Sequence, residues 1–179
     1  MMKILEMQYG KMKKMMTNAL RQLDQAGIAY EVRTYEYDEA DLSGVKAASV
    51  LNLPMDRMYK TLVAQGDRKG YLVCCLAVDR EVDLKQLALL SGDKRVELIP
   101  VKELLPLTGY LRGGCSPVGM KKKWPTFFDE RVLGQEHIAV SAGQRGVQMI
   151  VAVSDLIRLT GAKIGSFSRC AADGLQINP

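Results

Sequence analysis

Two consecutive apolar segments constrain the fold more than any other feature of this sequence. They are "YKTLVAQ" at residues 59–65 and "YLVCCLAVD" at residues 71–79, and the polar segment "GDRKG" separates them. Two strand-like runs joined by a short turn with glycines are typical of a β-hairpin. The second run is apolar on both faces, so we expect its strand to lie at the centre of a sheet.

Helical and strand patterns alternate along the rest of the chain. The expected helices cover residues 17–27, 43–53, 83–92 and 154–161. The further strands expected cover residues 30–38, 95–101, 137–143 and 147–153. Thr17 and Ser154 have the character of N-caps, and Pro106 ends a broken helical turn. The interleaving, together with the hairpins, predicts an α+β (mixed α/β) fold with a curved, mixed, largely antiparallel sheet and helices packed outside.

Length and charge bound the organisation of the chain. With 179 residues we expect one domain over residues 17–170, a basic, flexible extension at 1–16 and a tail at 171–179. The formal net charge of +5 favours an anionic partner, but the extension carries +3 of it. Bulk charge therefore does not establish nucleic-acid binding.

No run approaches the ~18–20 apolar residues that span a bilayer, and the first residues lack the pattern of a secretory signal. We therefore expect a cytoplasmic protein that does not contact membranes. The four cysteines show no C-x-x-C spacing, and His137 is the single histidine. This pattern argues against a disulfide framework and a metal site, and we expect no cofactor. Cys115 has no evident base beside it, which disfavours a nucleophilic role.

Lys60 is the first candidate for a functional residue. In the strand pattern it shares a face with Leu62 and Ala64, so its ammonium group lies at the mouth of an apolar strand. A lysine in that place can be partly desolvated and can attract an anionic ligand. The alternative is a lysine that extends its charged end into water from the end of the strand.

A second candidate is the loop "GYLRGGCSP" at residues 109–117. Gly113 and Gly114 allow a close approach of the backbone to a ligand, and Ser116 adds a hydroxyl group. Backbone N–H groups in such a loop can bind phosphate or carbonyl oxygens. A plain surface turn also uses glycine and proline, so both interpretations remain open.

Basic residues follow this loop. A run of three lysines precedes Trp124, Phe127 and Phe128, a combination that suits single-stranded nucleic acid or, alternatively, a solvated charge run beside core aromatics. Arg145 lies in the expected turn "VSAGQRG", and Asp155 follows the expected cap Ser154, where it can simply complement the helix dipole. The candidate nucleic-acid contacts are Lys121, Lys122, Lys123 and Arg145.

The ordered set of motifs resembles one known family. The segments are "TYEYD", "YKTL", "DLK", "KRVE", "TGYLRGGCSP", "GMKKK", "VSAG" and "DLI", spread over residues 17 to about 168. In this order they resemble the YbaK/EbsC family of free-standing Cys-tRNA(Pro) deacylases, which are similar to the editing domain of bacterial prolyl-tRNA synthetases.

The resemblance implies an editing fold that binds the aminoacylated 3′ end of tRNA and cleaves the aminoacyl ester without a protein nucleophile. In the Cys-specific members the thiol of the substrate is proposed to attack the ester carbonyl. Lys60 matches the functionally important lysine of the family, and a complex with prolyl-tRNA synthetase is expected by analogy. The positions that match the substrate pocket are Tyr35, Gly113, Gly114, Ser116 and Asp155.

Two other functions stay open at this point. One is a related deacylase for another mischarged tRNA, such as Ala-tRNA(Pro), because small side chains differ by only ~1–3 kcal/mol in a hydrophobic pocket. The other is a non-catalytic module that binds tRNA or a synthetase. Fold-level similarity alone does not decide between these functions.

Overall fold

The predicted hairpin is the centre of the molecule. The computed structural model describes residues 16–171, so the expectations for 1–15 and 172–179 lie outside the described residues. Strand β2 (Tyr59–Gly66) pairs antiparallel with β3 (Gly70–Ala77) along its whole length. β3 is the middle strand of a five-stranded sheet with the order β5-β2-β3-β6-β9, as its apolar faces predict.

The five-stranded sheet is mixed. β5 (Val96–Leu98) pairs antiparallel with β2, whereas β6 (Thr126–Asp129) lies parallel to β3, and β9 (Lys163–Gly165) lies parallel to β6. The sequence analysis found no strand in the 109–130 segment. That expectation is wrong for β6, because all four of its residues are buried and show no alternation of polarity.

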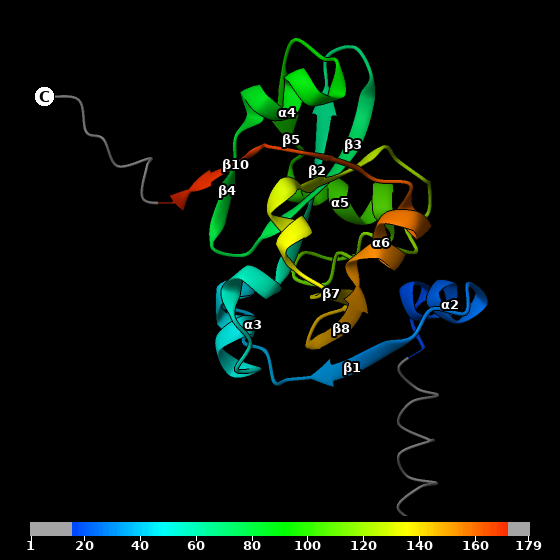
Figure 1. Ribbon diagram of the computed structural model, residues 1–179. Coiled ribbons are helices and arrows are strands. Elements are labelled where there is room, and N and C mark those ends of the chain that lie inside the picture. Colours follow the sequence, from blue (N-terminus) through cyan, green and yellow to red (C-terminus); the bar gives the residue numbers. More distant parts are fainter. Residues whose placement is uncertain (1–15, 172–179) are drawn as a thin grey trace, which may run out of the picture.

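A second sheet of three strands lies beside the hairpin (Figure 1). Its order is β1 (Tyr30–Thr34), β8 (Val147–Ala152) and β7 (His137–Gln144), all antiparallel. β1 ends earlier than predicted, although the Tyr35 N–H still donates to the carbonyl oxygen of Gly146. A two-stranded ribbon of β4 (Arg80–Val82) and β10 (Ser168–Cys170) completes the pairing.

Helices cover the sheets. They are α2 (Asn18–Gln25), α3 (Gly44–Val50), α4 (Leu84–Ser91), α5 (Val101–Thr108) and α6 (Val153–Thr160), with short 3-10 turns at η1 (Met55–Arg57) and η2 (Glu130–Gly134). Thr17 caps α2 as predicted, since its hydroxyl oxygen accepts from the Leu20 N–H. Among the described residues, no helix is long and apolar enough to cross a membrane.

Two expectations about helix ends are wrong. Pro106 lies inside α5 and does not end it; the helix ends at Gly109, which adopts a positive φ of 84°. Ser154 lies within the first turn of α6, and the cap position belongs to Ala152, which has no side-chain oxygen. In both cases packing of the helix outweighs the local signal.

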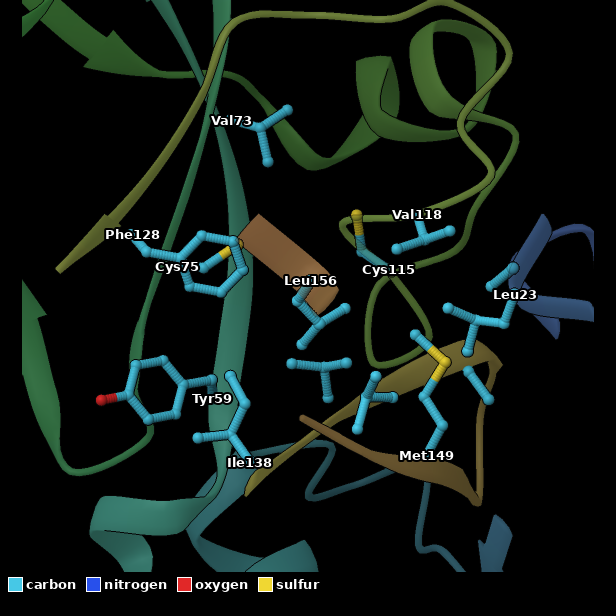
Figure 2. Packing of buried hydrophobic residues seen from close by; sticks show 14 of the residues in the cluster. Leu23, Tyr59, Val73, Cys75, Cys115, Val118, Phe128, Ile138, Met149 and Leu156 are labelled. Atoms are coloured by element: carbon cyan, nitrogen blue, oxygen red, sulfur yellow. The ribbon is translucent and has the colours of Figure 1, made fainter. Parts of the chain in front are cut away.

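The largest buried cluster joins the two sheets. It brings Tyr59, Cys75 and Phe128 from the five-stranded sheet against Ile138 and Met149 of the smaller sheet (Figure 2). Phe127 is buried on the opposite side, against α4. Both phenylalanines therefore belong to the core, which rules out the nucleic-acid stacking that the sequence left open for them.

Candidate functional site

A cavity of about 410 Å³ lies along the edge of β2. Its walls come from β2 itself, the start of α3, the start of α5, the 112–115 segment and one face of β7 and β8. This volume is in the range of small-molecule sites. Segments that are far apart in the sequence thus form one concave surface.

The cavity exists because β5 is short. β5 pairs with β2 only from Ala64 to Gly66, and one further bond joins the Ile99 N–H to the Val63 carbonyl oxygen at 3.1 Å. Pro100 then turns the chain into α5. In a strand, the backbone N–H and C=O groups of every second residue point to the same side. The backbone groups of Thr61 therefore point to the same edge of β2 as those of Val63, at a place where β5 no longer pairs with β2. Thr61 lines the cavity at this edge.

Lys60 lines the same cavity and is half-buried. Its Nζ donates to the carbonyl oxygen of Val78 at 3.3 Å and to that of Arg80. An ammonium group has three N–H donors, so one donor remains after these two bonds. Burial lowers the pKa of Lys60, while the nearby carboxylates of Glu81 and Asp79 oppose that change. The arrangement presents a positioned, partly desolvated cation to the cavity.

The glycine loop divides into two sets of residues. Gly113 and Cys115 line the cavity, and Gly113 needs its glycine because its φ is +84° and Leu42 lies about 3.2 Å from the place of a Cβ. Gly114 and Ser116 are buried on the other side of the loop. Gly114 packs on the backbone at Arg145, with 3.0 Å between that amide nitrogen and a Cβ position. The Ser116 hydroxyl oxygen accepts from the Val118 N–H. Of the loop residues predicted to bind substrate, Gly113 therefore faces the cavity, whereas Gly114 and Ser116 do not line it.

One part of the cavity wall is polar. Tyr35, Ser141 and Gln148 line it, and the last two are neighbours across β7 and β8. The Ser141 hydroxyl oxygen accepts from the Gly143 N–H at 3.2 Å, which leaves its own proton free. Gln148 as a residue is almost fully buried, and its carboxamide makes no hydrogen bond with any residue of 16–171. Because Gln148 lines the cavity, this carboxamide is available to a ligand.

The charge inside the cavity has one sign. Lys60 and Arg112 line it, and no acidic residue of the described chain does.

Burial raises the pKa of the Cys115 thiol to about 12, which disfavours the thiolate needed for nucleophilic attack. His137 lies at the start of β7 in a separate hollow with Tyr30 and Arg57. Within residues 16–171 no cluster of three His, Cys, Asp or Glu side chains is arranged to hold a metal ion.

Several predicted site residues lie elsewhere. Asp155 is on α6, where its carboxylate pairs with Arg158 at 2.7 Å, and it does not line the cavity. Arg145 is at the tip of the β7–β8 hairpin, where its Nε donates to the Arg112 carbonyl oxygen and its guanidinium pairs with Glu39. The three lysines Lys121, Lys122 and Lys123 are exposed, and the last two line a smaller hollow beside Trp124.

Comparison with known proteins identifies the family. Residues 40–159 match the family model described as the aminoacyl-tRNA editing domain. The chain belongs to the aminoacyl-tRNA editing domain family. An Enterococcus faecalis protein assigned as a Cys-tRNA(Pro)/Cys-tRNA(Cys) deacylase, EbsC, is 39% identical over 152 residues, which is 85% of this chain and 93% of that protein.

Two further comparisons place this editing domain among its relatives. A proline–tRNA ligase of Thermosipho africanus is 31% identical over 77 residues, which cover 43% of this chain and 14% of the ligase. A crystal structure assigned as a trans-editing enzyme for prolyl-tRNA synthetase has the same fold, with a TM-score of 0.74 at 24% identity over 85% of this chain and 95% of that one. The family that the sequence motifs predicted is therefore confirmed.

The sequence analysis missed Arg112, Ser141 and Gln148. Gln148 had a detectable signal, because it is the one strongly polar residue in the apolar run "VQMIVAV". Arg112 and Ser141 had none, since an arginine in a loop and a serine near a turn are ordinary surface residues. Their role in the cavity depends on how the two sheets and the loop meet.

Proposed function

We propose that this protein is a trans-editing deacylase that cleaves the aminoacyl ester of mischarged Cys-tRNA(Pro). The observation that carries the proposal is Lys60, whose ammonium group is held by two carbonyl oxygens and has one donor left for a ligand. It lies in a cavity that no described acidic residue lines. The 39% identity to a protein assigned as a Cys-tRNA(Pro)/Cys-tRNA(Cys) deacylase supports the same substrate class.

The chemistry requires positioning more than a protein nucleophile. In the proposed reaction the thiol sulfur of the substrate forms a bond with the ester carbonyl carbon, and the bond from that carbon to the ribose oxygen breaks. The thiol proton ends on the ribose hydroxyl, and water then opens the small cyclic thioester. Holding sulfur and carbonyl in contact converts a slow encounter into an intramolecular step. The high pKa of Cys115 fits a mechanism that does not use it.

Each wall of the cavity has a proposed role. Lys60 binds the ribose–phosphate side of the terminal nucleotide, and the edge peptide of Thr61 faces the aminoacyl carbonyl together with Gly113. Donors of this kind stabilise the negative charge that develops on the carbonyl oxygen. Ser141 of β7 and Gln148 of β8 are proposed to bind the α-amino group through their oxygen atoms. Tyr35 closes the same side.

The test is single-turnover deacylation of Cys-tRNA(Pro) by the wild type and by Lys60→Ala. We expect the substitution to reduce the rate by at least about 100-fold, as loss of one positioned electrostatic donor does elsewhere. Lys85→Ala, on the exposed face of α4, is the matched control and should keep full activity. A fully active, folded Lys60→Ala protein would remove Lys60 from the mechanism. Parallel reactions with Ala- and Ser-charged tRNA(Pro) separate the Cys-specific function from the related deacylases.

We also propose where the protein acts and which protein it binds. The protein acts in the cytoplasm, where aminoacyl-tRNA is made, and it associates with prolyl-tRNA synthetase. The partial match to a proline–tRNA ligase supports the second statement only by analogy. Co-elution of the purified protein with prolyl-tRNA synthetase and tRNA(Pro) is the measurement that checks it.

A further inference from the structure

The rim of the cavity contains an apolar surface that the reaction itself does not use. Val101, at the start of α5, lines the cavity and is 59% exposed; Leu98, at the end of β5, lines it and is 43% exposed. Leu105 is 45% exposed and lies one helical turn after Val101, so the two side chains are neighbours on the surface of α5. We call Leu98, Val101 and Leu105 the apolar shelf.

A cation lies at the same rim. Arg112 lines the cavity and is exposed, and its guanidinium group forms no ion pair with any residue of 16–171. Its backbone is fixed, because the Arg112 carbonyl oxygen accepts from Arg145 Nε at 2.8 Å and Arg145 is in turn paired with Glu39. Of these two arginines, Arg145 already forms an ion pair, whereas the guanidinium group of Arg112 forms none with the described residues.

We propose that the apolar shelf and Arg112 together bind the terminal nucleotide of an RNA 3′ end, the shelf against the base and Arg112 against a phosphate. A nucleotide combines a flat base with apolar faces and an anionic phosphate, which matches an apolar surface next to an unpaired guanidinium. The shelf is continuous with the cavity, and the cavity holds Lys60 and no described acidic residue. This charge favours RNA over a protein segment as the occupant.

The inference rests on the proposed function, because it is the tRNA substrate that brings a nucleotide to this rim. It adds residues that position the RNA and do not contact the reacting atoms. The terminal base and the aminoacyl group are joined through one ribose, so a shelf at the cavity mouth binds the base while the ester lies inside.

The experiment measures binding of an uncharged RNA hairpin with a single-stranded 3′ end to the full chain by fluorescence anisotropy. The same RNA with its terminal base removed is the second probe. We expect Val101→Ser/Leu105→Ser to weaken binding of the complete RNA on the order of fivefold and to leave the abasic RNA unchanged. We expect Arg112→Gln to weaken both RNAs and to reduce the slope of log K against log salt by about 0.7. Leu89→Ser, at an exposed leucine of α4 outside the cavity, is the control.

Three outcomes overturn the inference. Equal loss for both RNAs in the shelf variant would mean that the shelf does not contact the base. An unchanged salt slope in Arg112→Gln would remove the phosphate contact. Weakened binding of prolyl-tRNA synthetase with unchanged RNA binding would make the shelf a protein-docking surface. If the wild type deacylates Cys-tRNA(Pro) while the rim variants bind RNA normally, only this inference fails; if the wild type neither binds RNA nor deacylates, the proposed function fails with it.

Discussion

Gln148 carries a carboxamide on the otherwise apolar strand β8, and it lines the cavity. Gln148 is only 6% exposed, and its carboxamide forms no hydrogen bond with the described residues. No described partner uses this carboxamide to hold the fold together, whereas a ligand in the cavity can bind it. We therefore expect Gln148 to contribute to binding more than to stability.

Replacement of Gln148 should therefore separate activity from stability. We expect Gln148→Met, which has a similar volume, to keep or raise the melting temperature and to reduce deacylation by about 10-fold or more. Thermal unfolding and single-turnover rates of the same preparation check both parts. Gln86→Met, on the exposed face of α4, is the control for the substitution itself. A variant that loses stability and keeps its activity would show that Gln148 has a structural role.

At the scale of secondary-structure elements, reciprocal hydrogen bonds hold the turn between β2 and β3 in place. The Asp93 carboxylate accepts from the backbone N–H groups of Arg68 and Lys69 at 2.9 and 2.8 Å. Asp67, within the turn, accepts from the N–H groups of Lys94 and Arg95 at 2.9 and 3.1 Å. These four bonds join the hairpin to the segment between α4 and β5. They fix where β5 begins along β2, and with it the length of edge left to the cavity.

The Asp93 interaction predicts a pH dependence of stability. Burial acts to raise the pKa of Asp93, but hydrogen bonds from the Ser91 hydroxyl and from the Lys69 and Arg68 N–H groups outweigh it, and the net pKa is lowered. A carboxyl group with a lowered pKa in the folded state stabilises fully above its unfolded pKa of about 3.9. That contribution is lost as the pH falls through the folded pKa.

We therefore expect Asp93→Asn to lower the free energy of unfolding by about 1–3 kcal/mol at pH 7 and by less at pH 3, which lies below the unfolded pKa of about 3.9, so that part of the stabilisation by the charge is already lost. Urea unfolding of both proteins at the two pH values measures the difference. Glu36→Gln, at an exposed position, should show no comparable change between pH 7 and pH 3. An equal effect at both pH values would contradict the assignment.

At the scale of the whole molecule, the two sheets and the 109–118 loop meet around a cavity that contains no imidazole. Figure 2 shows Cys115 and Val118 on this loop, at the edge of the cluster that joins the sheets. The single histidine of the sequence lies in a separate hollow. The cavity therefore holds two cations, backbone donors and neutral polar groups, a composition that is compatible with the proposed attack by the substrate thiol.

The dependence of the reaction on pH follows from that arrangement. We expect the single-turnover rate with Cys-tRNA(Pro), corrected for spontaneous hydrolysis, to rise with pH as the substrate thiol ionises near its ordinary pKa of about 8.5. A Ser-charged tRNA(Pro) should not be turned over, and His137→Ala should keep the wild-type profile. A plateau above about pH 7, the range expected for a histidine base, or loss of activity in His137→Ala would contradict substrate-assisted chemistry.

The local parts of the fold could be predicted because their causes are local. The hairpin follows from two apolar runs and a polar turn. Thr17 begins α2 and Gly92 ends α4, each through contacts within a few residues. Lys60 and Gly113 were recognisable candidates for the same reason, since a cation in an apolar strand and a paired glycine are unusual wherever they lie. The strand β6 and the continuation of α5 through Pro106 were not predictable, because burial against distant residues decides both.

The sequence by itself determined the family, the central hairpin and the candidate residues on β2 and on the glycine loop. Only the tertiary structure decided which of the candidates share a cavity. It brings Lys60, Gly113 and Tyr35 together, adds Arg112, Ser141 and Gln148, and leaves Asp155 on another surface. The physical reason is that a cavity forms where several elements meet, and local sequence does not determine how they meet. Here β5 pairs with only part of β2, and the two sheets pack beside each other, so that residues distant in the chain line one cavity.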